Sequence, residues 1–279
     1  MPEENLNVSI GGSVETAIRG EYSIDIRNVL FEAWQQTLKS RLSINLGLFL
    51  ILLLGMLVSF FVSNFFGGIE LVIEQAQEQN SQALQLVNAI VTIAVWPFIA
   101  GVEMMGVYHA IKKPTKTNMV LSFLNRGSWV ALCALLTSIL ISIGFQLLVL
   151  PGLLLAVLLS LTIPLVVEKK FTPMQAIIVS IKALRFKIWS LLAIYFVLCM
   201  ALISLLFPIA LLLNTSLAPL AIMVFLYGLS YIAPWYYNVK GILYREIFGV
   251  YVAQNTEQNN GYLTDNDTGH NGSDDTFSA

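Results

Sequence analysis

One ionisable side chain, Glu103, lies deep within an apolar stretch of the sequence, where a carboxylate is costly to bury. The stretch 87–111 holds no other charge, and the next cation, Lys112, follows nine residues later, about 13 Å along a helix. An ionisable group at that depth in a membrane usually faces the interior of a helix bundle and marks a functional site. The alternative is a neutral carboxylic acid that joins helices as a hydrogen-bonding group.

No Lys or Arg falls inside another apolar stretch, so we expect Glu103 to have no charged partner. Desolvation then favours its protonated form. A hydroxyl group from another helix is the other expected partner. The candidates for that hydroxyl are Tyr227, Tyr231, Thr137, Ser142 and Ser160.

Motifs for enzyme chemistry are missing from the chain. The sequence contains no GxGxxG, GxxxxGK[ST], HExxH or GxSxG pattern, and only two histidines, His109 and His270. The two cysteines, Cys133 and Cys199, lie in apolar runs without metal-ligand spacing, and we expect each to pack as a small hydrophobe. We therefore predict no catalytic residue, no metal site and no cofactor, and expect that the protein is not an enzyme.

Three acidic residues, Glu70, Glu74 and Glu78, recur at intervals that would place them on one helical face. A cation site is one interpretation. A solvated acidic face is the other, and we favour it because nothing nearby would complete a coordination shell.

The composition indicates a multi-pass membrane protein. Of 279 residues, 57% are hydrophobic and only 11% are charged, against about 25% in an average soluble domain. The mean hydropathy is +0.75. The 15 Lys and Arg residues against 17 Asp and Glu give no basic field for a nucleic acid, so we exclude that class of partner.

Apolar gaps between charges predict six membrane spans, since a bilayer core needs roughly 20 apolar residues. The gap 127–167 is 41 residues long, too long for one crossing, and we expect it to turn at Pro151-Gly152. The gap 188–239 is interrupted by Asn214-Thr215-Ser216 and Pro219. The predicted spans are residues 42–66, 87–111, 127–150, 151–168, 188–213 and 217–239.

The basic residues predict the orientation of these spans. All 15 fall in four segments: before the first span, between the second and third, between the fourth and fifth, and after the sixth. The alternate loops, 67–86, 151–152 and 214–218, carry none. Positive residues collect on the cytoplasmic side of a membrane, so both termini are expected in the cytoplasm.

Two segments outside the spans read as amphipathic helices. Residues 23–38 place apolar side chains at helical spacing, and so do residues 172–187, where Thr172 and Pro173 are a typical helix start. In the second helix Met174, Ile177, Ile178, Ile181 and Leu184 form the predicted apolar stripe, and Lys182, Arg185 and Lys187 flank it. We expect these three cations to contact anionic lipid headgroups, or else the helix is a docked linker.

The predicted fold class is therefore an all-α integral membrane protein with six transmembrane helices and two cytoplasmic interfacial amphipathic helices. Residues 23–253 form the membrane domain. We expect residues 1–22 to be a flexible cytoplasmic N-terminus. The polar residues 254–279 should form a disordered cytoplasmic tail, because they hold almost no aliphatic side chains.

The segment 150–189 resembles part of a known group of proteins. Its matching residues are Pro151, Gly152, Pro164, Glu168, Ala176, Ser180, Arg185 and Trp189. On these it resembles uncharacterised bacterial multi-pass inner-membrane proteins of the YciC type and the membrane domain of some glycerophosphodiester phosphodiesterases. The resemblance implies a six-helix bacterial inner-membrane protein. It implies no activity, since the chain lacks a phosphodiesterase domain.

Two functions remain open. The first is a non-enzymatic scaffold or envelope-maintenance factor that acts through contacts with membrane lipids, some of them anionic, or with other proteins. The alternative is a small-molecule or ion transporter that uses Glu103 and broken helices, which Pro97, Pro164, Pro208 and Pro234 suggest. A polar cavity that reaches Glu103 would favour transport, and a packed apolar interior would favour the scaffold.

Overall fold

The computed structural model describes residues 7–65, 67–68, 82–212 and 214–253. The chain divides into two units, one of residues 1–9 and 251–279 and one of residues 10–250. Strands β1 (Asn7–Ile10) and β2 (Val250–Ala253) pair in a two-stranded sheet. The helices described all belong to residues 10–250.

Those helices follow the predicted spans closely. They are α1 (Val14–Arg19), α2 (Ile26–Phe65), α4 (Gln82–Ala110), η1 (Thr117–Leu121), η2 (Leu124–Arg126), α5 (Gly127–Leu147), α6 (Val149–Leu158), α7 (Thr162–Val167), α8 (Pro173–Leu184), η3 (Arg185–Lys187), α9 (Ile188–Leu212) and α10 (Ala218–Phe248). Six helical segments among the described residues are long and apolar enough to cross a membrane. The prediction of an all-α, multi-pass membrane protein is therefore confirmed, whereas the interfacial placement of two helices stays a prediction.

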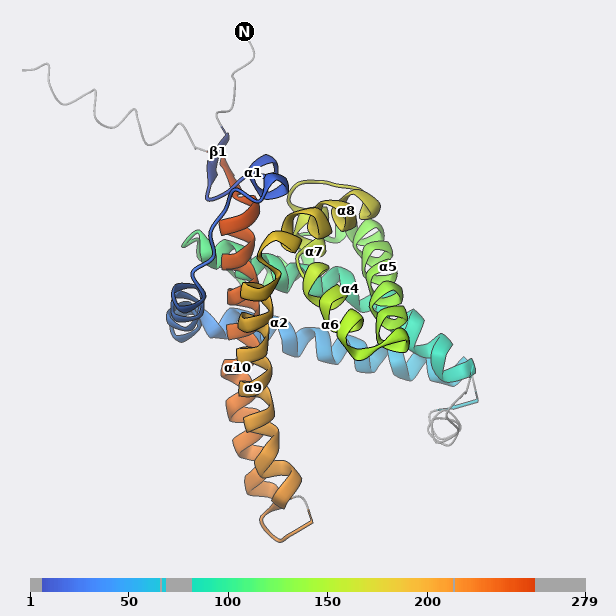
Figure 1. The fold of residues 1–279 in the computed structure, drawn as a ribbon. Coiled ribbons are helices and arrows are strands. Elements are labelled where there is room, and N and C mark those ends of the chain that lie inside the picture. The colour runs from blue at the N-terminus through green and yellow to red at the C-terminus, as the bar shows by residue number, and fades with distance from the viewer. Residues whose placement is uncertain (1–6, 66, 69–81, 213, 254–279) are drawn as a thin grey trace, which may run out of the picture. The chain divides into compact units, whose positions relative to one another are not determined.

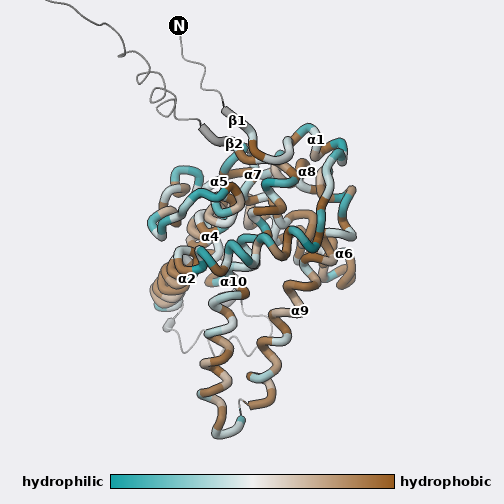
Figure 2. Tube along the Cα trace, turned by 90° about the vertical axis from the view of Figure 1, so that its left-hand side faces the viewer, coloured by the Kyte–Doolittle hydropathy of each residue, from teal (hydrophilic) through white to brown (hydrophobic). Residues whose placement is uncertain are grey.

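The long helices pack as two pairs. Helix α2 lies along α4, α9 and α10 form a hairpin, and α10 also packs on α2 and α4 (Figure 1). The two pairs cross steeply, so that α2 is seen end-on where α9 and α10 run lengthwise, with apolar residues over most of α2, α9 and the outer part of α10 (Figure 2). Helices α5, α6 and α7 pack together beside α4.

The main core lies where α4, α7 and α10 meet. Its fully buried side chains include Met104, Leu161, Leu165, Leu243, Tyr244 and Phe248. Cys133 packs in this core as expected, whereas Cys199 is exposed on α9.

The N-terminal segment is more ordered than we expected. Helix α1 begins at a reciprocal cap in which Ser13 and Thr16 exchange hydrogen bonds, and it ends at Gly20, whose φ of 77° suits glycine. Tyr22 donates to the carbonyl of Ala183 in α8 at 2.8 Å, and burial raises the pKa of Tyr22 to about 12. The hydroxyl therefore stays protonated at neutral pH and ties residues 10–22 to α8.

The first predicted amphipathic helix joins the first span. Residues 26–65 form one helix with a kink at Ser40, where φ is −134° and ψ is 20°. Before the kink Val29 and Ala33 are buried, as the apolar pattern predicts, whereas Leu38 is exposed. The non-helical residue Ser40 separates two helices, which agrees with a first helix that leads into the span.

The turn between spans three and four lies earlier than predicted. A single extended residue, Leu148, separates α5 from α6, and Pro151 falls in the first turn of α6. Proline loses no helical hydrogen bond there, so it begins the helix and does not break it. Gly152 packs closely against Gly144 and Phe145, which lets α5 and α6 run side by side.

The sixth span continues past its predicted end at residue 239. Helix α10 extends to Phe248, and residues 238–243 are buried. The predicted acidic face at Glu70, Glu74 and Glu78 and the predicted tail 254–279 lie outside the described residues.

Candidate functional site

The site lies at the crossing of α4 and α10, where two glycines bring the backbones into contact. A Cβ on Gly106 would collide with the carbonyl of Tyr237, and one on Gly241 would collide with the carbonyl of Gly106. Small residues at a membrane helix crossing permit this close approach. The polar residues beside the two glycines are therefore held within reach of the opposite helix.

Glu103 forms a buried ion pair across this crossing. Its Oε1 lies 2.5 Å from Lys240 Nζ, and the two residues are 4% and 5% exposed. Our expectation that Glu103 has no charged partner is wrong, because α10 continues beyond residue 239 and directs Lys240 toward α4.

A cavity of about 340 Å³ adjoins the ion pair. The cavity has room for several waters or one small molecule. Helices α4, α5, α6, α7, α9 and α10 and the segment between α6 and α7 line it. Its polar side chains are Glu103, Thr137, Ser138, Ser160, Thr162, Tyr195, Tyr236 and Lys240.

One buried polar atom in the lining, Oε2 of Glu103, has no hydrogen-bond partner among the described residues. Buried polar atoms in proteins are nearly always hydrogen-bonded, and an unpaired carboxylate oxygen is especially costly. An unpaired carboxylate oxygen thus lies buried in the wall of the cavity.

The wall of the cavity includes a break in the fourth span. Helix α6 ends at Leu158 and α7 begins at Thr162. The hydroxyls of Ser160 and Thr162 donate to the carbonyls of Val157 and Leu159, each at 2.8 Å, and Ser180 donates to Leu158 at 2.6 Å. These bonds add to the backbone bonds from Ser160 and Thr162 to the same two carbonyls of Val157 and Leu159, and together they stabilise the interrupted backbone.

The four prolines that we expected to break helices do not do so. Pro97, Pro208 and Pro234 lie inside continuous helices, and Pro164 sits in the first turn of α7, after the break.

The hydroxyls that we expected near Glu103 divide into two groups. Thr137 and Ser160 line its cavity, although neither bonds to the carboxylate. Tyr227 and Tyr231 bond to each other on the exposed part of α10, and Ser142 lines another pocket between α4 and α5. Lys240 takes the place of all five as the partner.

A second polar cluster, which the sequence did not predict, lies six residues further along α4. His109 is buried, and its Nδ1 lies 2.9 Å from Asn238 Oδ1 while its Nε2 lies 2.7 Å from the Thr115 hydroxyl. Asn238 in turn donates to Thr37 at 2.9 Å. The sequence held one indication of this cluster: His109 and Asn238 both lie near the ends of predicted spans, on the same side of the membrane.

The predicted headgroup-contacting residues stand apart from this site. Lys182 and Arg185 are exposed and Lys187 is partly exposed, on α8 and η3. The apolar stripe of α8 splits, since Ile177 and Leu184 are buried against the protein while Met174 and Ile178 are exposed. Exposed apolar and basic groups side by side suit a membrane surface, so the lipid contact stays a prediction.

Comparison with protein-family models, with curated proteins and with solved structures found no match for this chain.

Proposed function

We propose that this protein transports a small polar molecule through the cytoplasmic membrane of a bacterium. One observation carries the proposal: a cavity of about 340 Å³ within the membrane helices contains the Glu103–Lys240 ion pair and an unpaired carboxylate oxygen. Ionisable residues inside membrane proteins are expensive to bury and usually line substrate or ion pathways. A break in a membrane helix beside the cavity is a further feature common in transporters.

The scaffold hypothesis does not need this cavity. A protein that acts only through its outer surface is stabilised by tight apolar packing around Glu103, and an ion pair contributes little to that stability. The polar lining therefore supports transport above the scaffold.

The lining also suggests the class of substrate. Oε2 of Glu103 is an unpaired hydrogen-bond acceptor, and the carboxylate already binds one ammonium group. A second amino group or cation would satisfy it, and the Tyr195 hydroxyl and Lys240 would bind an acceptor or anionic group on the same molecule. We propose a small zwitterionic or amine-bearing substrate.

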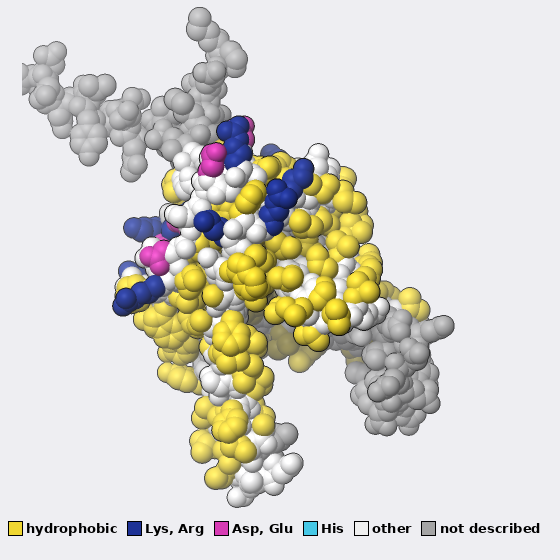
Figure 3. Space-filling model, viewed as in Figure 1, with side chains coloured by type: hydrophobic (Ala, Val, Ile, Leu, Met, Phe, Trp, Pro, Cys, Tyr) yellow, Lys and Arg dark blue, Asp and Glu magenta, His cyan; other side chains and the backbone are white. Residues whose placement is uncertain are grey.

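The placement in the membrane rests on charge. The Lys and Arg side chains in view lie around α1, α8 and the N-terminal end of α2, while the outer part of the α9–α10 hairpin shows hydrophobic and uncharged groups (Figure 3). By the positive-inside rule we place both termini in the cytoplasm. The resemblance of residues 150–189 to YciC-type proteins supports the bacterial inner membrane.

Access to the cavity tests transport without knowledge of the substrate. Ser160 is replaced by Cys in a Cys133→Ala/Cys199→Ser background, and the full chain is labelled in oriented vesicles with a membrane-impermeant thiol reagent. A transporter alternates between two open states, so labelling is expected from each side of the membrane. Val130→Cys, at a fully buried apolar position, serves as the unlabelled control.

Labelling of Ser160→Cys from only one side, or from neither, would contradict transport. The variant keeps a small polarisable side chain at the break, and we therefore expect it to fold. Its elution profile and its far-UV spectrum check the fold.

A further inference from the structure

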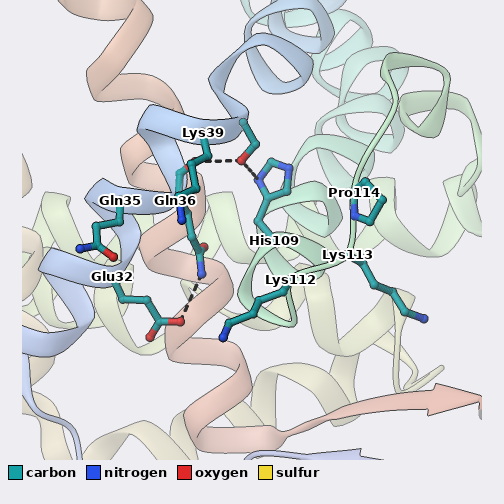
Figure 4. Close-up of a pocket in the computed structure, with 9 residues that line it drawn as sticks. Glu32, Gln35, Gln36, Lys39, His109, Lys112, Lys113 and Pro114 are labelled. Carbon is teal, nitrogen blue, oxygen red and sulfur yellow. Dashed lines mark hydrogen bonds between the residues drawn. The ribbon is translucent and has the colours of Figure 1, made fainter.

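A second pocket, of about 560 Å³, lies between the end of α4 and the part of α2 before its kink. Lys39 lines it from α2, and Lys112 and Lys113 line it from the segment after α4. Lys112 points toward Glu32 and Gln36, whereas Lys113 points away from them (Figure 4). Neither the intramembrane cavity nor the predicted headgroup contacts on α8 include these residues.

The pocket carries uncompensated positive charge. Its carboxylate, Glu32, is held by Arg245 through two hydrogen bonds, of 2.7 and 2.9 Å. Within the described part of the chain, Lys39 and Lys112 take part in no ion pair. Two ammonium groups therefore face one pocket, while its acidic group is already paired with Arg245, which also pairs with Glu246.

Gln36 lines the pocket and holds a buried, unpaired acceptor. Its Nε2 donates to Glu32 at 3.2 Å, and its Oε1 is buried without a partner among the described residues. A ligand that carries both an anionic group and a hydroxyl would satisfy the lysines and this oxygen together.

At the C-terminal end of α4, Lys112 adopts a backbone conformation that is costly for any residue other than glycine. The Lys112 and Lys113 amides bond back to the carbonyls of His109 and Tyr108, the pattern in which a left-handed residue closes a helix. That position normally holds glycine, and here Lys112 has a φ of 59°. His109 stabilises this end of the helix, because its two ring nitrogens bond to Asn238 and Thr115.

We infer that this pocket binds a phosphate-bearing anion through Lys39 and Lys112, with Gln36 accepting from a hydroxyl of the ligand. The phosphate belongs either to the headgroup of an anionic lipid or to a soluble phosphate compound. The inference does not depend on the proposed transport function, because no residue is shared between the two sites.

The test uses the full chain and two probes. One arm measures retention of phosphatidylglycerol against phosphatidylcholine by native mass spectrometry of protein from mixed-lipid nanodiscs. The other measures the shift of the melting temperature in detergent with inorganic phosphate. Retention of phosphatidylglycerol identifies a headgroup site, and stabilisation by phosphate without lipid retention identifies a soluble ligand.

Lys39→Gln/Lys112→Gln should weaken binding of the effective probe about fivefold per lysine, on the order of 30-fold together. Lys116→Gln/Lys170→Gln removes the same charge from exposed lysines outside the pocket and should change binding little. Gln36→Glu, which adds an opposing charge and keeps the side-chain size, should weaken binding as well. Equal binding of both probes by the wild type, the pocket variants and the control would overturn the inference.

Discussion

At the scale of single residues, the Glu103–Lys240 pair is hard to explain by stability alone. Removing two charges from water costs several kcal/mol each, and their attraction in the interior roughly repays that cost. Apolar residues of similar size would pack as well. A pair that is nearly neutral for folding, with one oxygen left unpaired at a cavity, is better explained by binding.

Replacing one member of the pair should therefore cost far more than replacing both. Lys240→Met leaves a buried carboxylate without its cation, and we expect the free energy of unfolding in detergent to fall by about 3–5 kcal/mol. Glu103→Leu/Lys240→Met should recover most of that loss. Denaturant titration followed by circular dichroism measures both, with Lys116→Met at an exposed position as the control. Additive losses in the double variant would argue against the coupling.

The sequence predicted one half of this site and missed the other. Glu103 was evident because it interrupts a long uncharged stretch. Lys240 was not, because it follows the apolar run of span six, and hydropathy places the end of a span where charges begin. Whether a lysine at that boundary points to water or to a neighbouring helix depends on how the helices cross, and this information is not local in sequence.

At the scale of elements, the crossing of α4 and α10 sets the geometry of the site. Gly106 and Gly241 touch through backbone atoms, and Glu103 and Lys240 lie within one turn of them. A side chain at either glycine would separate the helices and lengthen the ion pair.

We expect Gly241→Ala to destabilise the protein by at least about 2 kcal/mol, since its Cβ meets backbone that cannot move aside. The same change should abolish the labelling of Ser160→Cys that depends on the Glu103 cavity, because the wall of the cavity moves. Gly55→Ala is the matched control, since its Cβ would meet only Val95 Cγ2 at an ordinary 3.7 Å. A melting temperature equal to that of the control would contradict a tight crossing.

Local signals predicted some element boundaries and not others. The start of α8 at Pro173, with Thr172 and Gln175 exchanging capping bonds, follows from residue types that act within one turn. The exact positions of the turn at Leu148 and of the break before Thr162 do not, because residues 127–167 carry no charge that would mark them. At these two places tertiary packing sets the backbone conformation. Gly152 packs closely against α5, and the Ser180 hydroxyl donates to the carbonyl of Leu158.

At the scale of the whole molecule, charge and hydropathy predict six segments able to span a membrane. The packing of the helices adds a constraint that charge and hydropathy do not contain. The pair α2–α4 crosses the pair α9–α10 steeply (Figures 1 and 2). In this arrangement the two pairs cannot both run along one membrane normal. The side of the membrane reached by the α2–α4 connection is therefore the most informative single property of the protein.

The distribution of basic residues makes a definite prediction about that side. Single cysteines at residues 5, 115, 175 and 260 should react with an impermeant reagent only from the cytoplasm, and those at residues 75 and 216 only from outside, because loops 67–86 and 214–218 carry no Lys or Arg. Each cysteine is placed in the Cys133→Ala/Cys199→Ser background, and permeabilised cells provide the control for reactivity. A cytoplasmic residue 75 would invalidate the six-span topology. If residue 75 is outside, α2 and α4 cross the bilayer, and the steep crossing at Gly106 and Gly241 must then be met by tilt of both helix pairs.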